Sequence, residues 1–295
     1  MSQAARERVE NPEKIIRKIE KDWFAKTQDA VLKKLRANLS LDDFTRLLFS
    51  LPQPQYPKLS RLLPTMAPIP VQIEWTGQIG EELLRASTAF ARLVTTKYAE
   101  LAAKPLQDVA ILDYGCGYGR LARLMYYYTA PKNVFGIAPR AESIEHCHNH
   151  GLVENFTHSE NLPPTLPLSR KDFGLIYAFS VFTHTSKRAT LVALKACRDY
   201  IAPDGILVIT IRPAAYWDVA PDVPPEKRPA IKAEHETTGF AFVPHIWLPV
   251  DGDVTYGDTG MTLEWLETNA PAWKVCGTAT SPDDVYQIIV FLRPV

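Results

Sequence analysis

Three glycines at alternate positions separate an apolar segment from a helical one in the stretch Val109-Ala-Ile-Leu-Asp-Tyr-Gly-Cys-Gly-Tyr-Gly-Arg120. Glycine lets the backbone approach a ligand where a Cβ atom would collide, and Asp113 ends the apolar strand two residues before the first glycine. A helix expected over 120–129 would begin beside that ligand. The pattern predicts a loop for a nucleotide-type cofactor; an ordinary strand-turn-helix junction is the alternative.

The spacing of the glycines disfavours a dinucleotide cofactor. The fingerprint of NAD-binding folds is G-x-G-x-x-G, whose third glycine lets the helix pack closely on the strand. Arg120 stands at that third position in this chain. Tyr118 and Arg120 are candidates for contacts to a cofactor carboxylate or to a second substrate; the alternative is that they only form the start of the helix.

His184 follows the apolar segment 173–180. In open α/β sheets, ligands bind outside the carboxyl ends of the strands, so this histidine is expected near the cofactor loop. An imidazole with the ordinary pKa of about 6.5 suits removal of a proton from a hydroxyl or an amine. His184 is therefore the candidate general base; capping of the next helix is the competing interpretation.

Residues 213–260 are rich in proline, glycine, aspartate and aromatic residues, and they are too many for a simple connection. Insertions of this length are usually functional. Because this insertion follows the fifth strand, at the sheet edge of the glycine loop, we expect it to cover the acceptor site. Its candidate substrate contacts are Tyr216, His235, His245 and Tyr256; a loop that packs its own aromatic side chains is the alternative.

No metal site is predicted. The segment 146–150 holds three histidines and a cysteine, but only the first and last histidine share a helix face, and no carboxylate pattern completes a ligand set. The aspartates of 251–258 lack the spacing of a calcium-binding loop. They are interpreted as turn residues.

Strands and helices alternate from the glycine loop onward, which predicts an α/β fold with a parallel sheet covered on both faces. A helix over 80–103 leads into the strand that begins at Val109. Further strands are expected over 133–138, 173–180, 206–211, 273–280 and 285–292, and further helices over 141–150, 186–200 and 262–269.

The N-terminal part of the chain has a different character. Apolar residues recur at three- and four-residue intervals over 12–50, which predicts one or two amphipathic helices. Prolines at 52, 54, 57, 64, 68 and 70 indicate that the next segment is not regular helix. We therefore expect a helical arm with a proline-rich connector over 1–70 and the main domain over 71–295.

The amino-acid composition argues against some classes of binding partner. Thirty-three basic residues balance thirty-three acidic ones in a chain of 295 residues, so no overall field draws the protein to nucleic acid or to an anionic membrane. The four cysteines show no paired spacing, and neither a signal sequence nor a membrane span is evident. These features predict a cytoplasmic protein with a small-molecule ligand, no nucleic-acid partner and no membrane partner.

Two motifs in the expected order carry a family resemblance. Leu112-Asp-Tyr-Gly-Cys-Gly-Tyr-Gly-Arg120 resembles the first motif of class I S-adenosylmethionine (SAM) dependent methyltransferases, an apolar strand and an acid before G-x-G-x-G. Asp172-Phe-Gly-Leu-Ile-Tyr-Ala-Phe-Ser-Val-Phe-Thr-His184 and the following helix and strand resemble a later region of a bacterial subgroup that acts on sugars and other small metabolites. The segment 72–80 also resembles that subgroup, where the chain passes near the methionine end of the cofactor.

The resemblance implies a Rossmann-like seven-stranded sheet, SAM as the cofactor, and methyl transfer to an oxygen or nitrogen of a small molecule. It assigns the following residues to the cofactor: Asp113, Tyr114, Gly115, Cys116, Gly117, Ala138, Ser180 and Val181. Ala138 departs from the family, whose second strand normally ends in an acid that binds the ribose. Glu142, or water and backbone, would have to replace it. Gly174 stands where the family usually has aspartate.

The alternative to an enzyme is a non-catalytic binding or assembly module on a degenerate methyltransferase fold. Ala138 motivates this alternative, because the loss of the ribose acid would weaken cofactor binding. The N-terminal helices would then be the surface for a partner. In either case they are the expected site of association between copies of the chain.

Overall fold

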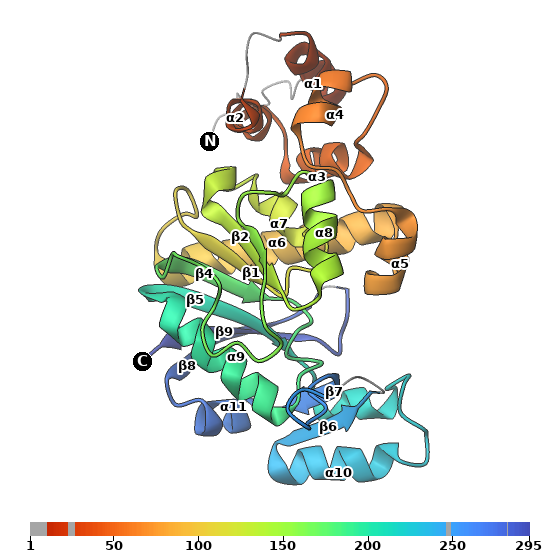
Figure 1. Cartoon of the computed structure of the whole chain (residues 1–295), viewed down its shortest axis with the longest axis vertical. Coiled ribbons are helices and arrows are strands. Elements are labelled where there is room, and N and C mark those ends of the chain that lie inside the picture. Colours follow the sequence, from red (N-terminus) through yellow and green to blue (C-terminus); the bar gives the residue numbers. More distant parts are fainter. Residues whose placement is uncertain (1–10, 23–26, 246–248, 282) are drawn as a thin grey trace, which may run out of the picture.

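The computed structural model describes residues 11–22, 27–245, 249–281 and 283–295, so parts of the expected N-terminal helices and of the insertion lie outside the described residues. At its centre is a seven-stranded sheet of order β3-β2-β1-β4-β5-β9-β8 (Figure 1). Its strands are β1 (Ile111–Tyr114), β2 (Val134–Ala138), β3 (Phe156–His158), β4 (Phe173–Ala178), β5 (Ile201–Ile211), β8 (Trp273–Thr280) and β9 (Ile288–Pro294). The first five are parallel, and β9 runs antiparallel to both of its neighbours. The predicted α/β fold is confirmed; β3 had no prediction of its own.

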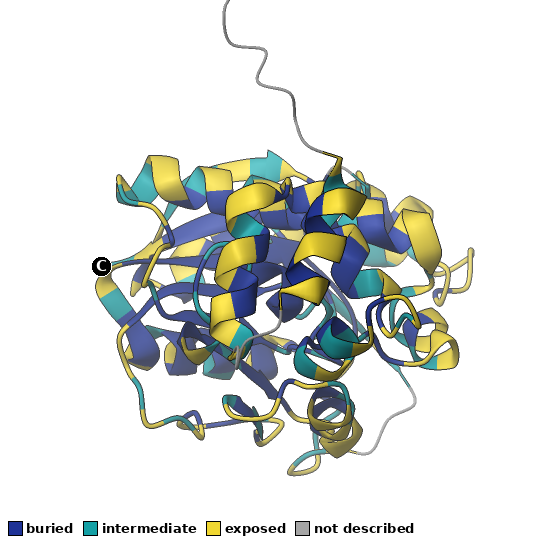
Figure 2. Ribbon diagram, turned by 90° about the horizontal axis from the view of Figure 1, so that it is seen from above, coloured by how far each residue is buried: buried dark blue, intermediate teal, exposed yellow. Residues whose placement is uncertain are grey.

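Apolar side chains from both faces of the sheet form two cores. Neighbouring residues of a strand point to opposite faces, so Ile111 and Tyr177 belong to one core while Leu112 and Ile176 belong to the other. Helices α6 (Gly80–Ala102), α7 (Arg120–Met125) and α8 (Ala141–Asn149) cover the first face. Helices α9 (Lys187–Tyr200) and α11 (Leu263–Asn269) cover the second. Figure 2 shows the buried strands between helices whose outer faces are exposed.

The N-terminal part forms five helices among the described residues: α1 (Pro12–Lys21), α2 (Gln28–Asn38), α3 (Leu41–Ser50), α4 (Pro57–Leu62) and α5 (Ile69–Thr76). The expectation of no regular helix in the proline-rich connector is wrong for α4 and α5. Their prolines lie in the first turn, where a missing N–H costs nothing. Leu32 and Phe44 are fully buried in the same core as Ile111. Helix α3 contacts α6, and the Phe44 ring packs on Tyr127 after α7, so the arm packs on the helical layer that covers this face of the sheet.

The insertion 213–260 is more regular than the sequence predicted. It contains a short 3-10 helix η2 (Ala214–Asp218), helix α10 (Arg228–Thr238), and strands β6 (Phe240–Pro244) and β7 (Gly257–Met261), which pair antiparallel. Trp217, Val223 and Ala241 are buried in a small core of its own. This unit lies beside the carboxyl end of the main sheet (Figure 1).

Helix α7 ends at Met125 and is therefore shorter than the helix predicted over 120–129. None of the helices in the described ranges combines the length and the apolar character needed to cross a bilayer.

Candidate active site

The glycine loop connects β1 to α7 in a conformation that requires glycine. Gly115 and Gly117 have φ values of 78° and 53°, in the left-handed region that other residues avoid. A Cβ on Gly115 would lie 2.5 Å from Cγ2 of Val181. The backbone N–H groups of Gly115 and Cys116 both donate to the carbonyl oxygen of Ile137, at 2.8 and 2.9 Å. The end of β2 therefore holds the start of the loop in place.

Asp113 is buried beneath this loop, with 3% of its surface exposed. Burial raises the pKa of its carboxyl group from 3.8 to about 7, against the opposing effects of Tyr177 and Arg120. Its Oδ2 atom is buried and has no hydrogen-bond partner among the described residues. A buried carboxylate oxygen without a partner is costly, which is why the neutral form of Asp113 is favoured up to about pH 7.

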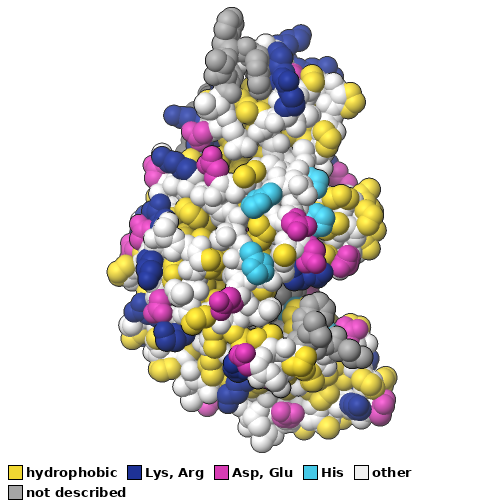
Figure 3. All heavy atoms as spheres, viewed as in Figure 1, with side chains coloured by type: hydrophobic (Ala, Val, Ile, Leu, Met, Phe, Trp, Pro, Cys, Tyr) yellow, Lys and Arg dark blue, Asp and Glu magenta, His cyan; other side chains and the backbone are white. Residues whose placement is uncertain are grey.

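A cavity of about 600 Å³ opens at the loop, between α5 and the segment before β7. The outline of the molecule is hollowed in this region (Figure 3). Eleven of the residues predicted for cofactor, acceptor or catalysis line the cavity: Asp113, Gly115, Cys116, Gly117, Tyr118, Arg120, Ala138, Ser180, Val181, His184 and Tyr256. Segments that are far apart in sequence thus meet at one sheet edge, as the rule for open α/β sheets predicts.

One end of the cavity is formed by the end of β2. Ala138 lines it together with Arg140 and Asn161. Glu142, the predicted substitute for the missing acid, is not among the lining residues; its side chain is 64% exposed and lies 3.9 Å from Nε of Arg140. Arg140 and Asn161 are polar side chains that line the cavity together with Ala138.

Trp75 and Tyr118 form an aromatic wall of the cavity. Their ring centroids are 6.0 Å apart, and the guanidinium of Arg140 lies 5.0 Å from the centroid of the Trp75 ring. Arg120 donates to Oγ of Ser87 at 2.6 Å and lies over the ring of Phe179. Trp75 belongs to the segment 72–80, which the sequence placed near the cofactor.

His184 lies in the loop after β4, at the other end of the cavity. Its Nδ1–H donates to the carbonyl oxygen of Gly257 at 2.9 Å, and its ring stacks on Tyr256 with centroids 5.3 Å apart. No described residue hydrogen-bonds to Nε2, so this nitrogen keeps its lone pair. Burial and the charge of Arg212 lower the pKa of His184 from 6.5 to about 4. The ring is therefore neutral at physiological pH, not half-protonated near pH 6.5 as its ordinary pKa would imply.

Four predicted site residues lie outside the cavity lining. Tyr114 packs in the core behind β1. Tyr216 donates from its hydroxyl to Oδ1 of Asp258 at 2.9 Å. His235 is fully buried in the insertion and accepts from Nε1 of Trp217 at 3.0 Å. His245 contacts Asp258 behind Tyr256. The contacts of these four side chains are internal to the protein.

Several polar residues of the cavity had no sequence signal. Ser281, Asp283, Asp284 and Gln287 reach it from the connection between β8 and β9. Asp283 is paired with Arg85 of α6, which brings the connection between β8 and β9 to the N-terminal part of that helix. Their place in the cavity follows from the pairing of β8 with β9, which the sequence alone did not give.

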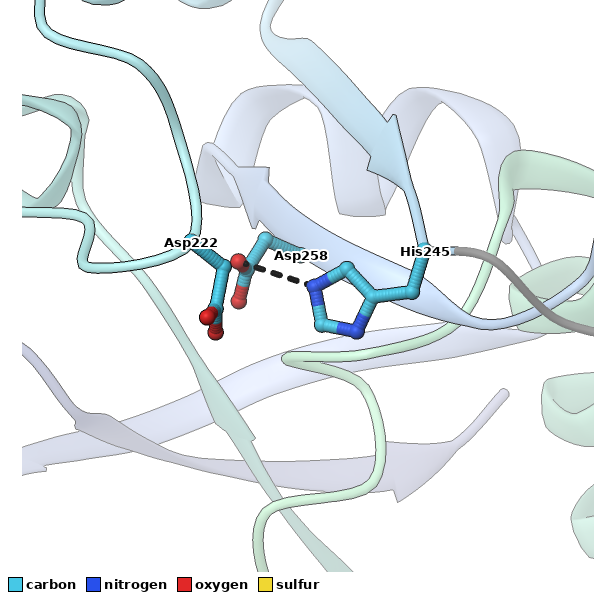
Figure 4. A group of neighbouring side chains, drawn as sticks. All are labelled: Asp222, His245 and Asp258. Carbon is cyan, nitrogen blue, oxygen red and sulfur yellow. Dashed lines mark hydrogen bonds and ion pairs between the residues drawn. The ribbon is translucent and has the colours of Figure 1, made fainter.

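Asp222, His245 and Asp258 come together behind the cavity, with one ligand-type atom of each within 4.8 Å of the others (Figure 4). Arg212 and Tyr216 already donate to Asp258. We interpret the group as part of a salt-bridge network, because Arg212 supplies the positive charge that a metal ion would bring. The absence of a metal site stays a prediction.

A family model described as a methyltransferase domain matches residues 85–245, more than half of the chain. The protein therefore belongs to the methyltransferase-domain family. A search of curated proteins finds no significant match.

Two solved structures of methyltransferases are similar to this chain. A SAM-dependent methyltransferase from Clostridium acetobutylicum ATCC 824 is 14% identical, with a TM-score of 0.50, over 72% of this chain and 95% of that one. Magnesium protoporphyrin IX methyltransferase from Synechocystis PCC 6803, with bound S-adenosylhomocysteine, is 13% identical over 76% and 92% of the two chains, with a TM-score of 0.47. The comparison with the Clostridium acetobutylicum structure, at 14% sequence identity, shows that the two proteins share a fold. This is the fold of class I SAM-dependent methyltransferases.

Proposed function

We propose that this protein transfers a methyl group from SAM to an oxygen or nitrogen of a small-molecule acceptor. The observation that carries the proposal is a single cavity that joins the glycine loop to His184 and Tyr256. Its volume of about 600 Å³ lies in the range of small-molecule sites. A cofactor and an acceptor bound at its two ends would meet without leaving the protein.

The cofactor end offers the chemistry that SAM requires. Gly115 and Gly117 let the backbone approach the ligand, and the carboxyl group of Asp113, a residue of the cavity lining, is proposed to attract the positively charged part of the cofactor. When bound, SAM supplies an electrophilic methyl group on a positively charged sulfur. Trp75 and Tyr118 add apolar aromatic surface to the lining of this cavity.

His184 is proposed to receive the proton of the acceptor. Its Nδ1 is engaged with Gly257 and its Nε2 carries a lone pair, so the ring is oriented to accept rather than donate. Methyl transfer needs mainly alignment of the two reactants. A base of low pKa removes this proton efficiently only in the transition state. There the acceptor atom gains positive charge as it bonds to the methyl group, and its proton becomes more acidic.

The acceptor is proposed to be a sugar or another small polar metabolite. Thr185, Ser281, Asp284 and Gln287 line the same cavity as His184 and carry groups that hydrogen-bond to hydroxyls and amines. The balanced charge of the chain continues to argue against a nucleic-acid acceptor. A cytoplasmic location and association through the N-terminal helices remain expectations.

Calorimetric titration with SAM and S-adenosylhomocysteine tests the cofactor. Transfer from methyl-labelled SAM to a panel of sugars and amines tests the reaction. We expect binding of both ligands and label transfer to at least one compound class. No heat from either ligand at millimolar concentration would instead favour the non-catalytic module, which the alanine at 138 motivates.

The pKa of Asp113 predicts a pH-dependent affinity for SAM. The ionised carboxylate binds a cation and the protonated one does not, so affinity is full above the unliganded pKa of about 7 and falls below it. Between pH 8 and pH 6 we expect a loss of about tenfold. The Asp113→Asn variant should bind weakly with this dependence removed, which separates Asp113 from titration of the ligand itself. An equal slope in both proteins would contradict the assignment.

The raised pKa of Asp113 also predicts how the Asp113→Asn variant should affect the stability of the protein. Its folded-state pKa lies above the unfolded value, so its ionisation lowers the stability of the unliganded protein as pH rises from about 4 to 7. Thermal unfolding at pH 8 should therefore show that Asp113→Asn is no less stable than the wild type. Weak SAM binding by this variant would then reflect the site and not the fold.

Restoring the missing acid should strengthen cofactor binding. An aspartate at 138 would place a carboxylate in the cavity lining, where charge-assisted hydrogen bonds to ribose hydroxyls contribute about 1.5 kcal/mol each, or roughly tenfold in Kd. Glu142→Ala is the matched comparison and should leave the Kd unchanged, because the Glu142 side chain is exposed. Weaker binding by Ala138→Asp, together with an effect of Glu142→Ala, would assign the ribose to Glu142.

A further inference from the structure

The loop that carries His184 is held by the insertion. The N–H of Ser186 donates to the carbonyl of Thr255 at 3.0 Å, and the N–H of Gly257 donates to the carbonyl of His184 at 2.9 Å. Because the His184 side chain also donates to the carbonyl of Gly257, its backbone and its ring are both fixed by the same residue. The position of His184 therefore depends on the position of β7.

Asp258, the next residue of β7, is the anchor of that strand. It is 1% exposed. Its Oδ1 accepts from Nη1 of Arg212 and from the hydroxyl of Tyr216. Its Oδ2 lies 3.2 Å from Nε2 of His245, the contact drawn as a dashed line in Figure 4. One carboxylate thus connects the end of β5, the η2 helix and the end of β6 to β7.

Arg212 extends this network to the loop after β4. Its Nη1 also donates to the carbonyl of Thr183 at 3.4 Å, and its side chain is only 11% exposed. A buried guanidinium is stable in this position because the Asp258 carboxylate neutralises it; loss of one partner leaves an uncompensated charge. Although burial acts to raise the pKa of Asp258, Arg212 and His245 hold it below its ordinary value, so the carboxylate is ionised at neutral pH.

We propose that Asp258 is a positioning residue, which holds β7 and Arg212 so that the Gly257 carbonyl presents Nε2 of His184 to the acceptor. Only the role of Nε2 as the atom that faces the acceptor rests on the proposed methyl transfer. That Asp258 fixes one tautomer of His184 does not depend on any ligand. Nδ1 of His184 lies 3.9 Å from Oδ1 of Asp258, too far for a direct hydrogen bond, so Asp258 acts through its neighbours.

The charged and titratable groups around His184 come from three elements. Arg212 and His245 act to lower its pKa, the Gly257 carbonyl and Asp258 act to raise it, and Tyr256 covers one face of the ring. These electrostatic effects partly cancel. The tautomer is therefore a better readout than the pKa, because it reports whether the bond from Nδ1–H to Gly257 is kept.

Long-range proton–nitrogen NMR spectra of the full chain report the tautomer of each histidine, and the His184→Gln variant assigns the signals of His184. In the wild type at pH 7 we expect the Nδ1–H form. In Asp258→Asn the population of this form should fall by about twofold or more, with the Nε2–H form appearing in exchange. The matched control is Asp251→Asn, an exposed turn residue of the same insertion that pairs with Arg188; the tautomer of His184 should not change in this variant.

In Asp258→Asn the buried charge of Arg212 loses its partner, and the protein could unfold for this reason alone. A second variant removes this ambiguity. The double variant Asp258→Asn/Arg212→Gln removes both buried charges together and should show the same loss of the Nδ1–H form. Retention of that form in the variants, or a wild type in the Nε2–H form, would overturn the proposal. A wild type that does not bind SAM would count against the proposed function and leave the tautomer result intact.

Discussion

Replacing Gly117 with valine is expected to abolish measurable SAM binding. Gly117 lies in the left-handed region, and a Cβ atom at this position would lie 3.4 Å from the Trp75 ring, so the branched side chain would occupy the cavity between the loop and this wall. A loss of at least about a hundredfold in affinity, near 2.7 kcal/mol, is the expected result in a calorimetric titration.

Gly252→Val is the matched control for this loss. Gly252 has the same left-handed backbone, with a φ of 79° and no atom within 4 Å of its Cβ position, and it lies in the turn of the insertion. Both variants should lose a similar amount of stability, about 1–2 kcal/mol, from backbone strain. Only Gly117→Val should lose SAM. Equal affinities for SAM in both variants and the wild type would show that the loop does not hold the cofactor.

The second large effect is expected at His184. Glutamine in its place keeps an amide that can donate to Gly257 but removes the imidazole base. We expect turnover with the acceptor to fall by roughly a hundredfold or more, while the Kd for SAM changes by less than about twofold, because His184 is proposed to contact the acceptor and not to bind the cofactor. Label transfer at saturating SAM measures the first quantity, and calorimetry the second.

The pH profile sharpens this test. Because the pKa of His184 is lowered to about 4, the wild-type rate should not fall near pH 6.5 on account of this group. It should fall only as pH approaches 4. His148→Gln is the control, since this histidine is exposed on α8 and bonds to the Phe156 carbonyl. Unchanged turnover in His184→Gln would remove His184 from the mechanism and leave Tyr256 as the titratable group of the cavity nearest to it.

Local patterns in the sequence were sufficient to predict the glycine loop and its place in the candidate site. The glycine loop is a contiguous segment whose conformation depends on its own glycines, and the rule for parallel strands brings His184 to the same edge. The structure agrees with both inferences: the loop and His184 line one cavity. The proline-rich connector was harder to predict, because a proline in the first turn of a helix and a proline in a loop look alike in sequence.

The acceptor end depended on contacts between distant segments. The pairing of Ser186 with Thr255 joins residues about seventy positions apart, and no local pattern specifies such a register. Contacts of this kind place Tyr256 in the cavity lining. His235 instead hydrogen-bonds to Trp217, and His245 to Asp258.

By itself, the sequence determined the fold class, the glycine loop and the edge of the sheet where this loop and His184 meet, because these follow from periodicity and from backbone freedom at glycine. Only the tertiary structure decided the state of the groups at that edge. Burial of Asp113 raises its pKa to about 7, and burial of His184 beside Arg212 lowers its pKa to about 4. Both shifts arise from desolvation and from distances to charges, which the order of residues does not contain.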